Sequence, residues 1–410
     1  MSNAASGVGI PAHVPPDLVM DFDFRNDPRL RADPWSVFNA MNDKPDIFFS
    51  PALGGYWVVT RAELVAEVMR RYDLFSVRNI GIPVVQGAPV VIPNNLDPPV
   101  HAKYRRILSQ QMFSPQALGS VEQDSRQLTR TLLERFERSG ACEFVEAYAR
   151  PLPVLSFLQM MDLPSERLPE FMSWIRGIFH SAATEERAAG FQHAHQFLSH
   201  WLDERMTGPL PVVGGHMLAA LLTAQVDGRR LTKDEMLSIA LMLLVGGLDT
   251  VTSQMTHIVR FLAESPPHRQ RVIDDPACIP DALEELLRRF GISNIARTVA
   301  RDCTFHGVAL KEDDSILCST PIANLDARVF PAPLAVDFDR PNRKDHWAFG
   351  AGIHLCPGAY LARVQIRVML EEVLPRLPHV RLAPRATIEY VSGGTLAIKA
   401  LPLVWDAPAV

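Results

Sequence analysis

The chain has 410 residues, of which 47% are apolar and 21% charged, and its 41 basic and 46 acidic side chains leave a net charge of −5. Such a length can enclose a large apolar core, and so small an acidic excess gives no overall reason to expect nucleic acid or an anionic membrane as a partner. The five cysteines contain no Cys-x-x-Cys pair, which argues against a structural zinc site, covalently attached c-type haem and a secreted disulfide framework.

The first 24 residues are rich in proline and weakly periodic, so we expect an irregular lead-in. No apolar run within residues 1–20 is long enough for a signal peptide or a membrane anchor, and we therefore expect a cytoplasmic protein that is not bound to a membrane. After the lead-in, the spacing of apolar residues predicts a helix over 35–41, a strand over 56–60 and an amphipathic helix over 62–71.

Residues 79–95 combine apolar side chains with repeated glycine and proline. These breaks exclude a regular helix or a central strand. An apolar loop of this length is uncommon unless it lines a binding site, although packing on the core explains it equally well. The interrupting residues are Gly81, Pro83, Gly87, Pro89 and Pro93.

The segment after Pro98 predicts a helix that carries His101 and Arg105 four residues apart. Two donors on one helical face can clamp a carboxylate, and a solvated face is the commoner explanation for such a pair. Residues 115–206 then alternate helical apolar stripes with short breaks, so this part of the chain should be mostly helical.

A long helix should begin near Thr232, where Glu235 suits a capping box, and run to about residue 263. Gly246 and a second glycine beside it each weaken a helix interior by about 1 kcal/mol relative to alanine, so a functional or packing gain should offset them. Asp249 and Thr250 follow and add an acid and an alcohol to that groove. Close packing against another helix is the alternative.

Further along, Glu285 and Arg288 lie three residues apart and can pair on one face of a helix. Residues 298–319 alternate as strands, with a turn at His306 and Gly307. A proline-rich meander over 331–341 leads to the last part of the chain.

Cys356 stands in a glycine-rich loop before a predicted helix over 359–374, which should stop at Pro375. Gly350 permits a turn in which the backbone approaches a ligand closely. A helix N-terminus directed at the sulfur lowers the pKa of a thiol, and cysteine thiolate is one of the few axial ligands of haem iron. A small buried cysteine beside a helix cap is the alternative.

Residues 349–358 form the pattern Phe-x-x-Gly-x-His-x-Cys-x-Gly, which resembles the haem-binding loop of the cytochrome P450 family. The resemblance extends over nearly the whole chain. It implies a single domain over 1–410, mostly α-helical with a smaller β-rich region, in a triangular prism with a long central helix over the haem. It also implies a monooxygenase whose haem b iron is bound by Cys356, the metal ligand. Pro357 has no N–H to donate to the sulfur, which should leave the thiolate more electron-rich.

The same resemblance assigns roles to residues outside the loop. Asp249 would relay protons, and Thr250 would hold water on the oxygen side of the haem. Glu285 and Arg288 would join Arg340 in a buried structural triad. The residues that would contact the haem or its propionates are His101, Arg105, Gly246, Arg297, Phe349, Gly350 and His354.

Stretches such as 244–250 and 400–406 are similar to the bacterial camphor 5-monooxygenase branch of the family. Where that branch has a tyrosine whose hydroxyl holds the substrate ketone, this chain has Pro89, which cannot donate a hydrogen bond. This difference argues against camphor and favours another small apolar cyclic terpenoid or norisoprenoid, such as an ionone-like ketone. The inferred substrate pocket comprises Ile80, Pro89, Val91, Met242, Ser293, Gly394 and Thr395.

The chain has no Gly-x-Gly-x-x-Gly strand-to-helix motif and no cysteine cluster for an iron–sulfur centre, so electrons must come from another protein. The resemblance implies a 2Fe-2S ferredoxin with its reductase, and we expect a monomer. A haem peroxygenase and a non-catalytic haem sensor or ligand carrier are the alternatives. Candidate residues for docking the ferredoxin are Lys103, Arg106, Arg343, Lys344 and Arg363.

Overall fold

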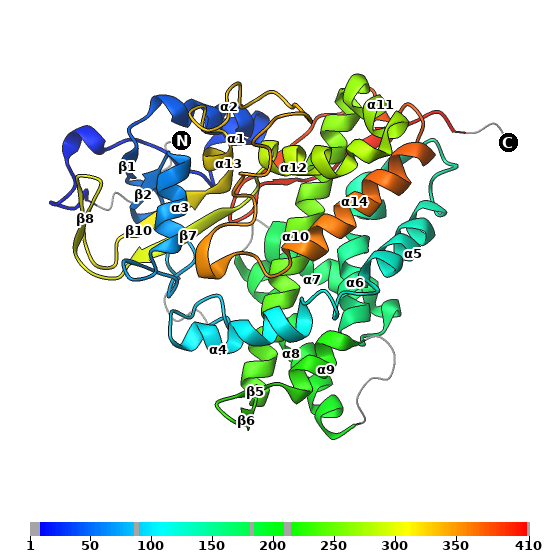
Figure 1. Cartoon of the computed structure of the whole chain (residues 1–410), viewed down its shortest axis with the longest axis horizontal. Coiled ribbons are helices and arrows are strands. Elements are labelled where there is room, and N and C mark those ends of the chain that lie inside the picture. Colours follow the sequence, from blue (N-terminus) through cyan, green and yellow to red (C-terminus); the bar gives the residue numbers. More distant parts are fainter. Residues whose placement is uncertain (1–8, 86–89, 181–183, 209–214, 408–410) are drawn as a thin grey trace.

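The larger sheet lies on one side of the molecule and most of the helices lie on the other, while a small two-stranded sheet lies apart at the lower end (Figure 1). The computed structural model describes residues 9–85, 90–180, 184–208 and 215–407. This arrangement confirms the expected mostly helical fold with a smaller β-rich region and a long central helix.

The described elements are numbered in chain order. The helices are α1 (Pro28–Ala32), α2 (Pro34–Asn39), α3 (Ala62–Arg70), α4 (Val100–Ile107), α5 (Val121–Leu133), α6 (Pro151–Met160), α7 (Leu168–His180), α8 (Thr184–Thr207), α9 (His216–Thr223), α10 (Lys233–Glu264), α11 (Pro266–Asp274), α12 (Ile279–Arg289), α13 (Thr320–Asn324) and α14 (Ala359–Arg376). The strands are β1 (Ile47–Ser50), β2 (Tyr56–Val59), β3 (Phe75–Ser76), β4 (Ala141–Glu143), β5 (Gln225–Val226), β6 (Arg229–Arg230), β7 (Asn294–Val299), β8 (Cys303–Phe305), β9 (Val308–Leu310), β10 (Ser315–Ser319), β11 (Arg381–Leu382), β12 (Tyr390–Val391), β13 (Ala397–Ile398) and β14 (Pro402–Val404).

Five strands form one mixed sheet in the order β1-β2-β10-β7-β3. β1 pairs antiparallel with β2, with Ile47 opposite Val59, whereas β10 runs parallel to β2 and antiparallel to β7. Successive side chains point to opposite faces of a strand. Trp57 therefore packs in an apolar cluster with α3, while Val58 packs in a second cluster with the helical part of the chain. The sheet thus separates two apolar cores.

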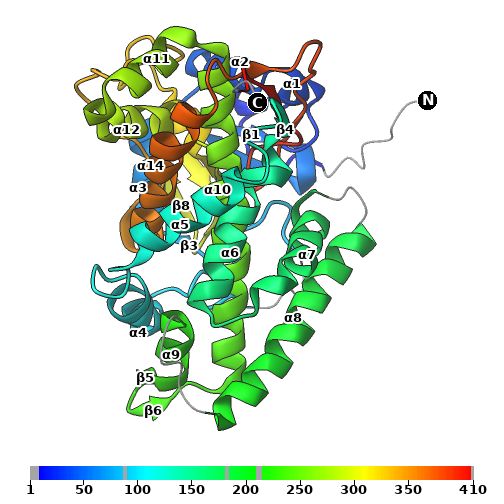
Figure 2. The same cartoon turned by 90° about the vertical axis from the view of Figure 1, so that its right-hand side faces the viewer.

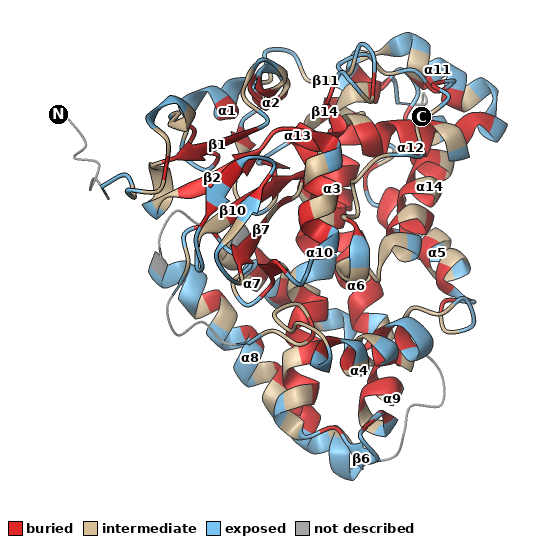
Figure 3. Ribbon diagram, turned by 60° about the vertical axis from the view of Figure 1, so that its left-hand side comes forward, coloured by how far each residue is buried: buried red, intermediate tan, exposed pale blue. Residues whose placement is uncertain are grey.

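Helix α10 runs through the middle of the molecule beside α6 and α14 (Figure 2). It begins as predicted: the Thr232 side chain accepts a hydrogen bond from the Glu235 N–H, and the Glu235 side chain accepts one from Thr232. By length and composition α10 is apolar enough to cross a membrane, but most of its length is buried inside the molecule. Figure 3 shows the buried residues concentrated on the sheet and on α10.

Most predicted elements are present within a few residues of their expected ends, including the turn at His306 between β8 and β9. One boundary is wrong, because α14 continues through Pro375 to Arg376. Proline lies there in the last turn, where it removes a single helical hydrogen bond. Val373, Leu374 and Leu377 around it are buried in the core, so tertiary packing holds the final turn in place.

Candidate functional site

The cysteine loop is held in place by its own backbone. Gly350 and Gly352 adopt left-handed conformations with φ of 75° and 71°. A Cβ on Gly352 would lie 2.8 Å from the carbonyl oxygen of Met69 on α3, so no side chain fits there. The N–H of Cys356 donates to the carbonyl of Phe349 at 3.0 Å and closes the turn. The loop therefore places the sulfur at the start of α14.

The surroundings of the sulfur act on the pKa of the Cys356 thiol in opposite directions. The Gly358 N–H donates toward the sulfur, and Arg105 and Arg363 add positive charge, so all three favour a thiolate. Burial opposes them and raises the pKa of the Cys356 thiol above its ordinary value. The helix N-terminus therefore lowers the thiol pKa as predicted, but in the polypeptide by itself burial outweighs it. A metal ion bound to the sulfur would supply the missing stabilisation.

His101 on α4 and His354 in the cysteine loop meet with ring centroids 4.2 Å apart. In the described part of the chain, neither buried Nε2 atom has a hydrogen-bond partner. Burial lowers the pKa of both imidazoles, that of His354 to about 3. Orphaned buried polar atoms are costly, so this pair is suited to a polar group that the chain itself does not contain.

Arg297 on β7 brings a full charge to the same place, and its charge is among the causes that lower the pKa of His354. The residue is only 4% exposed, and burial lowers its pKa. Within the described residues its guanidinium donates to the carbonyl of Ala296 at 2.9 Å and forms no ion pair. A buried arginine without an acidic partner is expensive. Three separate segments therefore present unpaired donors that fit carboxylates such as haem propionates.

Two other residues predicted to contact the cofactor are engaged with the loop itself. Arg105 donates to the carbonyl of Leu355 and so supports the residue next to Cys356. The ring of Phe349 lies 4.5 Å from the guanidinium carbon of Arg363, which adds a cation–π contact under the loop. These contacts brace the sulfur from two sides.

The middle of α10 carries an opening. Gly246 and Gly247 are exposed in a helix that is otherwise mostly buried, and a Cβ on either would meet no atom within 4 Å. The Thr250 hydroxyl donates to the carbonyl of Gly246 at 2.9 Å, whereas Asp249 is only 2% exposed. α10 also packs against α14. The two glycines therefore leave room for a ligand beside the alcohol.

The residues inferred to line a substrate pocket fall into separate groups. Ser293 and Thr395 form an isolated β-bridge, and Gly394 lies beside them with open space at its Cβ position. Met242 and Val91 pack in one apolar cluster, and the neighbouring backbone of the 79–95 loop is tied to Ser238 on α10. The two remaining residues of this group are Ile80, which is 36% exposed, and Pro89, which lies outside the described residues.

The buried triad is present. Glu285 contacts Arg288 at 2.8 Å and Arg340 at 3.1 Å, and the two arginines also donate to several backbone carbonyls. Sequence reasoning missed a second carboxylate next to it. Glu284 binds Arg363 at 2.6 Å and His346 at 3.0 Å, which links α12 to the start of α14. The repeated acid at 284–285 was the available signal.

Most of the predicted docking cations already have acidic partners. Lys103 contacts Asp227 at 2.5 Å, and Arg343 contacts Asp281 at 2.5 Å. Arg106 is exposed and forms no ion pair with any residue that the structure describes. Within the same described ranges, no group of three or more histidine, cysteine and acidic side chains is placed to hold a metal ion.

Comparisons with known proteins point to one family. Residues 279–385 match the family model for cytochrome P450. The chain is 31% identical over 407 residues to a probable cytochrome P450 127A1 of Sinorhizobium fredii, with 97% of each chain covered. It is 32% identical to a mycinamicin IV hydroxylase/epoxidase of Micromonospora griseorubida, over 85% of this chain and 89% of that protein. The crystal structure of CYP101J2 superposes with a TM-score of 0.88 at 32% identity, covering 97% of this chain and 99% of that one. The structure of CYP101C1 gives 0.87 at 30% identity, covering 97% and 100%.

Proposed function

The chain belongs to the cytochrome P450 family and is a haem-dependent monooxygenase, and on that premise we propose that it hydroxylates a small apolar cyclic terpenoid or norisoprenoid with electrons from a 2Fe-2S ferredoxin. The observation that carries the proposal is the convergence of unpaired buried donors on His354 beside a loop that presents Cys356. This set matches the charges of a haem, two carboxylates and an iron atom.

The residues present fit haem b. Cys356 would bind the iron, and His101, Arg297 and His354 would hold the propionates through donors that bind no acid among the described residues. Bound there, the haem would supply activation of dioxygen for insertion into a C–H bond. The protein would contribute the position of the sulfur, the exclusion of water and the delivery of protons.

Asp249 and Thr250 would divide the proton chemistry between them. The hydroxyl of Thr250 bonds along the helix to the Gly246 carbonyl at 2.9 Å, so it stands at the opening made by the two glycines. There it would hold a water molecule. Asp249 is buried, and its carboxylate would move a proton to that water from the interior side of α10.

An apolar substrate fits the character of the 79–95 loop. Val91 and Met242 pack in one apolar cluster, and no ion pair ties the described part of the loop to that cluster. Ser293 and Thr395 add a polar edge on another side. Proline at position 89 offers no hydroxyl to orient a ketone, so we expect selection by shape.

The substrate class is testable by the shift of the iron from low to high spin on titration. Ionone-like ketones and small cyclic terpenoids should give a large shift at micromolar concentration. Camphor should give a smaller one, and a linear fatty acid of equal carbon number is the control. A full shift with the linear acid and none with the cyclic compounds would overturn the proposed class.

The ferredoxin would approach the side on which the cysteine loop is exposed. Leu355 and Tyr360 flank Cys356 and are 46% and 54% exposed, and Arg106 and Lys344 supply exposed positive charge. We expect Arg106→Glu to slow reduction by an acidic ferredoxin, most strongly at low salt. The equivalent change of an exposed arginine on α1, Arg31→Glu, is the control. Equal turnover with hydrogen peroxide in place of ferredoxin and reductase would instead assign a peroxygenase.

A further inference from the structure

The first part of the 79–95 loop is bonded to the segment that precedes α1. The Nε of Arg25 donates to the carbonyl of Ile82 at 2.7 Å, a partly buried contact between residues 57 positions apart. Among the residues that the structure describes, no other hydrogen bond reaches residues 80–85. The last part of the loop is held elsewhere, because the Ser238 side chain on α10 bonds the backbone of Val90 and Ile92. Arg25 is therefore the polar anchor of the first part.

The segment that carries Arg25 is itself well fixed. Ile82 is 2% exposed and shares an apolar cluster with Phe24, whose ring lies 5.4 Å from the guanidinium carbon of Arg25. The Ser50 hydroxyl on β1 donates to the carbonyl of Phe22 at 2.9 Å. An anchor that rests on the sheet in this way can hold a loop of irregular structure in one position.

The guanidinium of Arg25 also meets the turn at 392–395. A Cβ on Gly393 would lie 3.7 Å from the Nη1 of Arg25, and the Ser392 hydroxyl donates to the carbonyl of Phe24 at 2.5 Å. Both this turn and the 79–95 loop contain residues inferred to line the substrate pocket. Arg25 thus stands between two segments that would contact the substrate.

The surroundings of Arg25 act on its charge without removing it. Burial lowers the pKa of Arg25, and the positive charge of Arg187 on α8 lowers it further. Arginine nevertheless stays charged in proteins. A hydrogen bond from a charged donor is stronger than one between neutral groups, so the bond to Ile82 is one of the stronger contacts that a single side chain can give the loop.

We propose that Arg25 is a positioning residue for the substrate, because its bond to Ile82 fixes the first part of the 79–95 loop against the 392–395 turn and so sets the width of the pocket between them. The inference rests on the proposed function, since it concerns the same pocket. A pocket of fixed width selects rigid cyclic molecules by shape and loses little freedom on binding them. Without the anchor, a bound substrate should leave faster.

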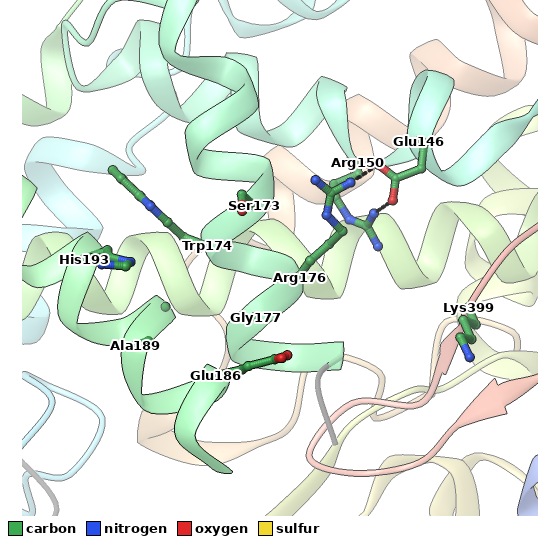
Figure 4. Close-up of a pocket in the computed structure, with 11 residues that line it drawn as sticks. Glu146, Arg150, Ser173, Trp174, Arg176, Gly177, Glu186, Ala189, His193 and Lys399 are labelled. Carbon is green, nitrogen blue, oxygen red and sulfur yellow. Dashed lines mark hydrogen bonds and ion pairs between the residues drawn. The ribbon is translucent and has the colours of Figure 1, made fainter. Parts of the chain in front are cut away.

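The alternative is an effect of charge alone, and two variants separate the two. Arg25→Met removes the donor and keeps the apolar stem. Arg25→Gln has no charge, but it places an N–H at the same position along the side chain as the Nε of arginine. Arg176→Met is the matched control, since Arg176 on α7 is a half-exposed arginine that reaches across to the Glu146 carboxylate at 3.1 Å instead (Figure 4).

The first experiment contains no substrate. Cleavage by proteinase K within residues 79–85 of the haem-loaded protein, mapped by mass spectrometry, reports how often this part of the loop leaves its position. Arg25→Met should be cleaved there about tenfold faster than the parent, as the loss of one bond from a charged donor implies. Arg25→Gln and Arg176→Met should be cleaved at nearly the parent rate.

The second experiment measures substrate release, with β-ionone as the probe ketone. Its dissociation, followed by the spin state in a stopped-flow instrument, should be about tenfold faster from Arg25→Met, and Arg25→Gln should restore most of the parent rate. KM should rise by a similar factor while kcat at saturating substrate stays within about twofold. If Arg25→Met does not fold, Ser392→Ala breaks the bond between the turn and Phe24 and should give a smaller rise in both rates.

The inference is wrong if Arg25→Met keeps the parent rates of cleavage and release. It is also wrong if Arg25→Gln behaves like Arg25→Met, which would assign the effect to charge. The proposed function fails separately, if the parent protein shows no spin shift with β-ionone or any other small cyclic terpenoid, because the cleavage experiment does not depend on a substrate.

Discussion

Two groups of basic side chains with buried polar atoms differ sharply in their hydrogen bonding: one is Arg288 and Arg340, and the other is His101, Arg297 and the half-buried His354. The first two share the carboxylate of Glu285 and spend their remaining donors on backbone carbonyls. Among the residues that the structure describes, the second group has two imidazole nitrogens without a hydrogen-bond partner and a guanidinium without an ion pair. A cluster whose polar atoms are bonded within the chain, here called saturated, stabilises the fold. An unsaturated cluster, whose polar atoms lack such partners, remains able to bind a molecule from outside.

Breaking the saturated cluster should have the largest effect. Arg288→Met leaves Glu285 buried with one partner fewer and should cost about 3–5 kcal/mol of unfolding free energy. Urea unfolding of the haem-free chain measures this cost. Arg271→Met removes a partly exposed pair with Asp339 and should cost less than about 1 kcal/mol. Equal midpoints for the two variants would contradict the assignment of the triad as structural.

A change in the unsaturated cluster should leave the stability of the fold nearly unchanged and weaken haem binding. His354→Phe removes an orphaned nitrogen, so the haem-free chain should unfold within about 1 kcal/mol of the parent. The variant should nevertheless lose haem to apomyoglobin about tenfold faster, as the loss of a charge-assisted bond of about 1.5–3 kcal/mol implies. His268→Phe is the control, because both ring nitrogens of His268 are already bonded, Nδ1 to the Ser265 hydroxyl at 2.7 Å and Nε2 to the carbonyl of Val336 at 3.2 Å. It should destabilise the fold and leave haem transfer unchanged; the reverse pattern would refute the comparison.

Thr250 tests whether a satisfied hydroxyl can still be functional. Thr250→Ala removes one hydrogen bond to a helical carbonyl and should change stability by about 1 kcal/mol or less. The coupling of electron consumption to hydroxylation should fall more strongly, with several-fold more of the consumed electrons recovered as hydrogen peroxide. Thr256→Ala loses the same kind of bond, to the carbonyl of Thr252 at 2.7 Å, and should remain coupled. Identical peroxide yields from both variants would remove Thr250 from the mechanism.

The smallest expected effect lies next to the sulfur. Only the Gly358 N–H donates toward Cys356 from the residues that follow it, because Pro357 has no N–H. Pro357→Leu adds a donor, which should withdraw electron density from the thiolate and raise the reduction potential of the iron. A spectroscopic redox titration of parent and variant measures the shift. Equal potentials would mean that the added N–H does not reach the sulfur.

Much of the site could be predicted from the sequence, because its main residues lie in short local patterns. The cysteine loop, the capping box at Thr232 and the Glu285–Arg288 spacing each depend on neighbours within a few positions, and all are present. Contacts between distant segments were harder. The contact between the rings of His101 and His354, 253 positions apart, was not predicted, because the family resemblance implied only that each residue contacts a propionate.

The features that the sequence did not predict also depend on contacts between segments that are distant in the chain. Local rules end a helix before Pro375, but burial of the residues around it extends α14 by two positions. Docking of a ferredoxin on Lys103 and Arg343 stays a prediction, but no local pattern indicated the aspartates that folding brings against them.

The tight contact between Gly352 and the backbone of Met69 has a consequence for how new specificities can arise. Met69 belongs to the apolar cluster on the α3 face of the sheet, and β7 of that sheet carries Arg297. The cysteine loop and the strand that carries Arg297 thus pack against the same sheet and helix. The described residues of the 79–95 segment contribute no strand to that sheet. Its sequence can therefore vary without changing how Cys356 would bind the iron. This segment is the first to randomise in a directed-evolution library.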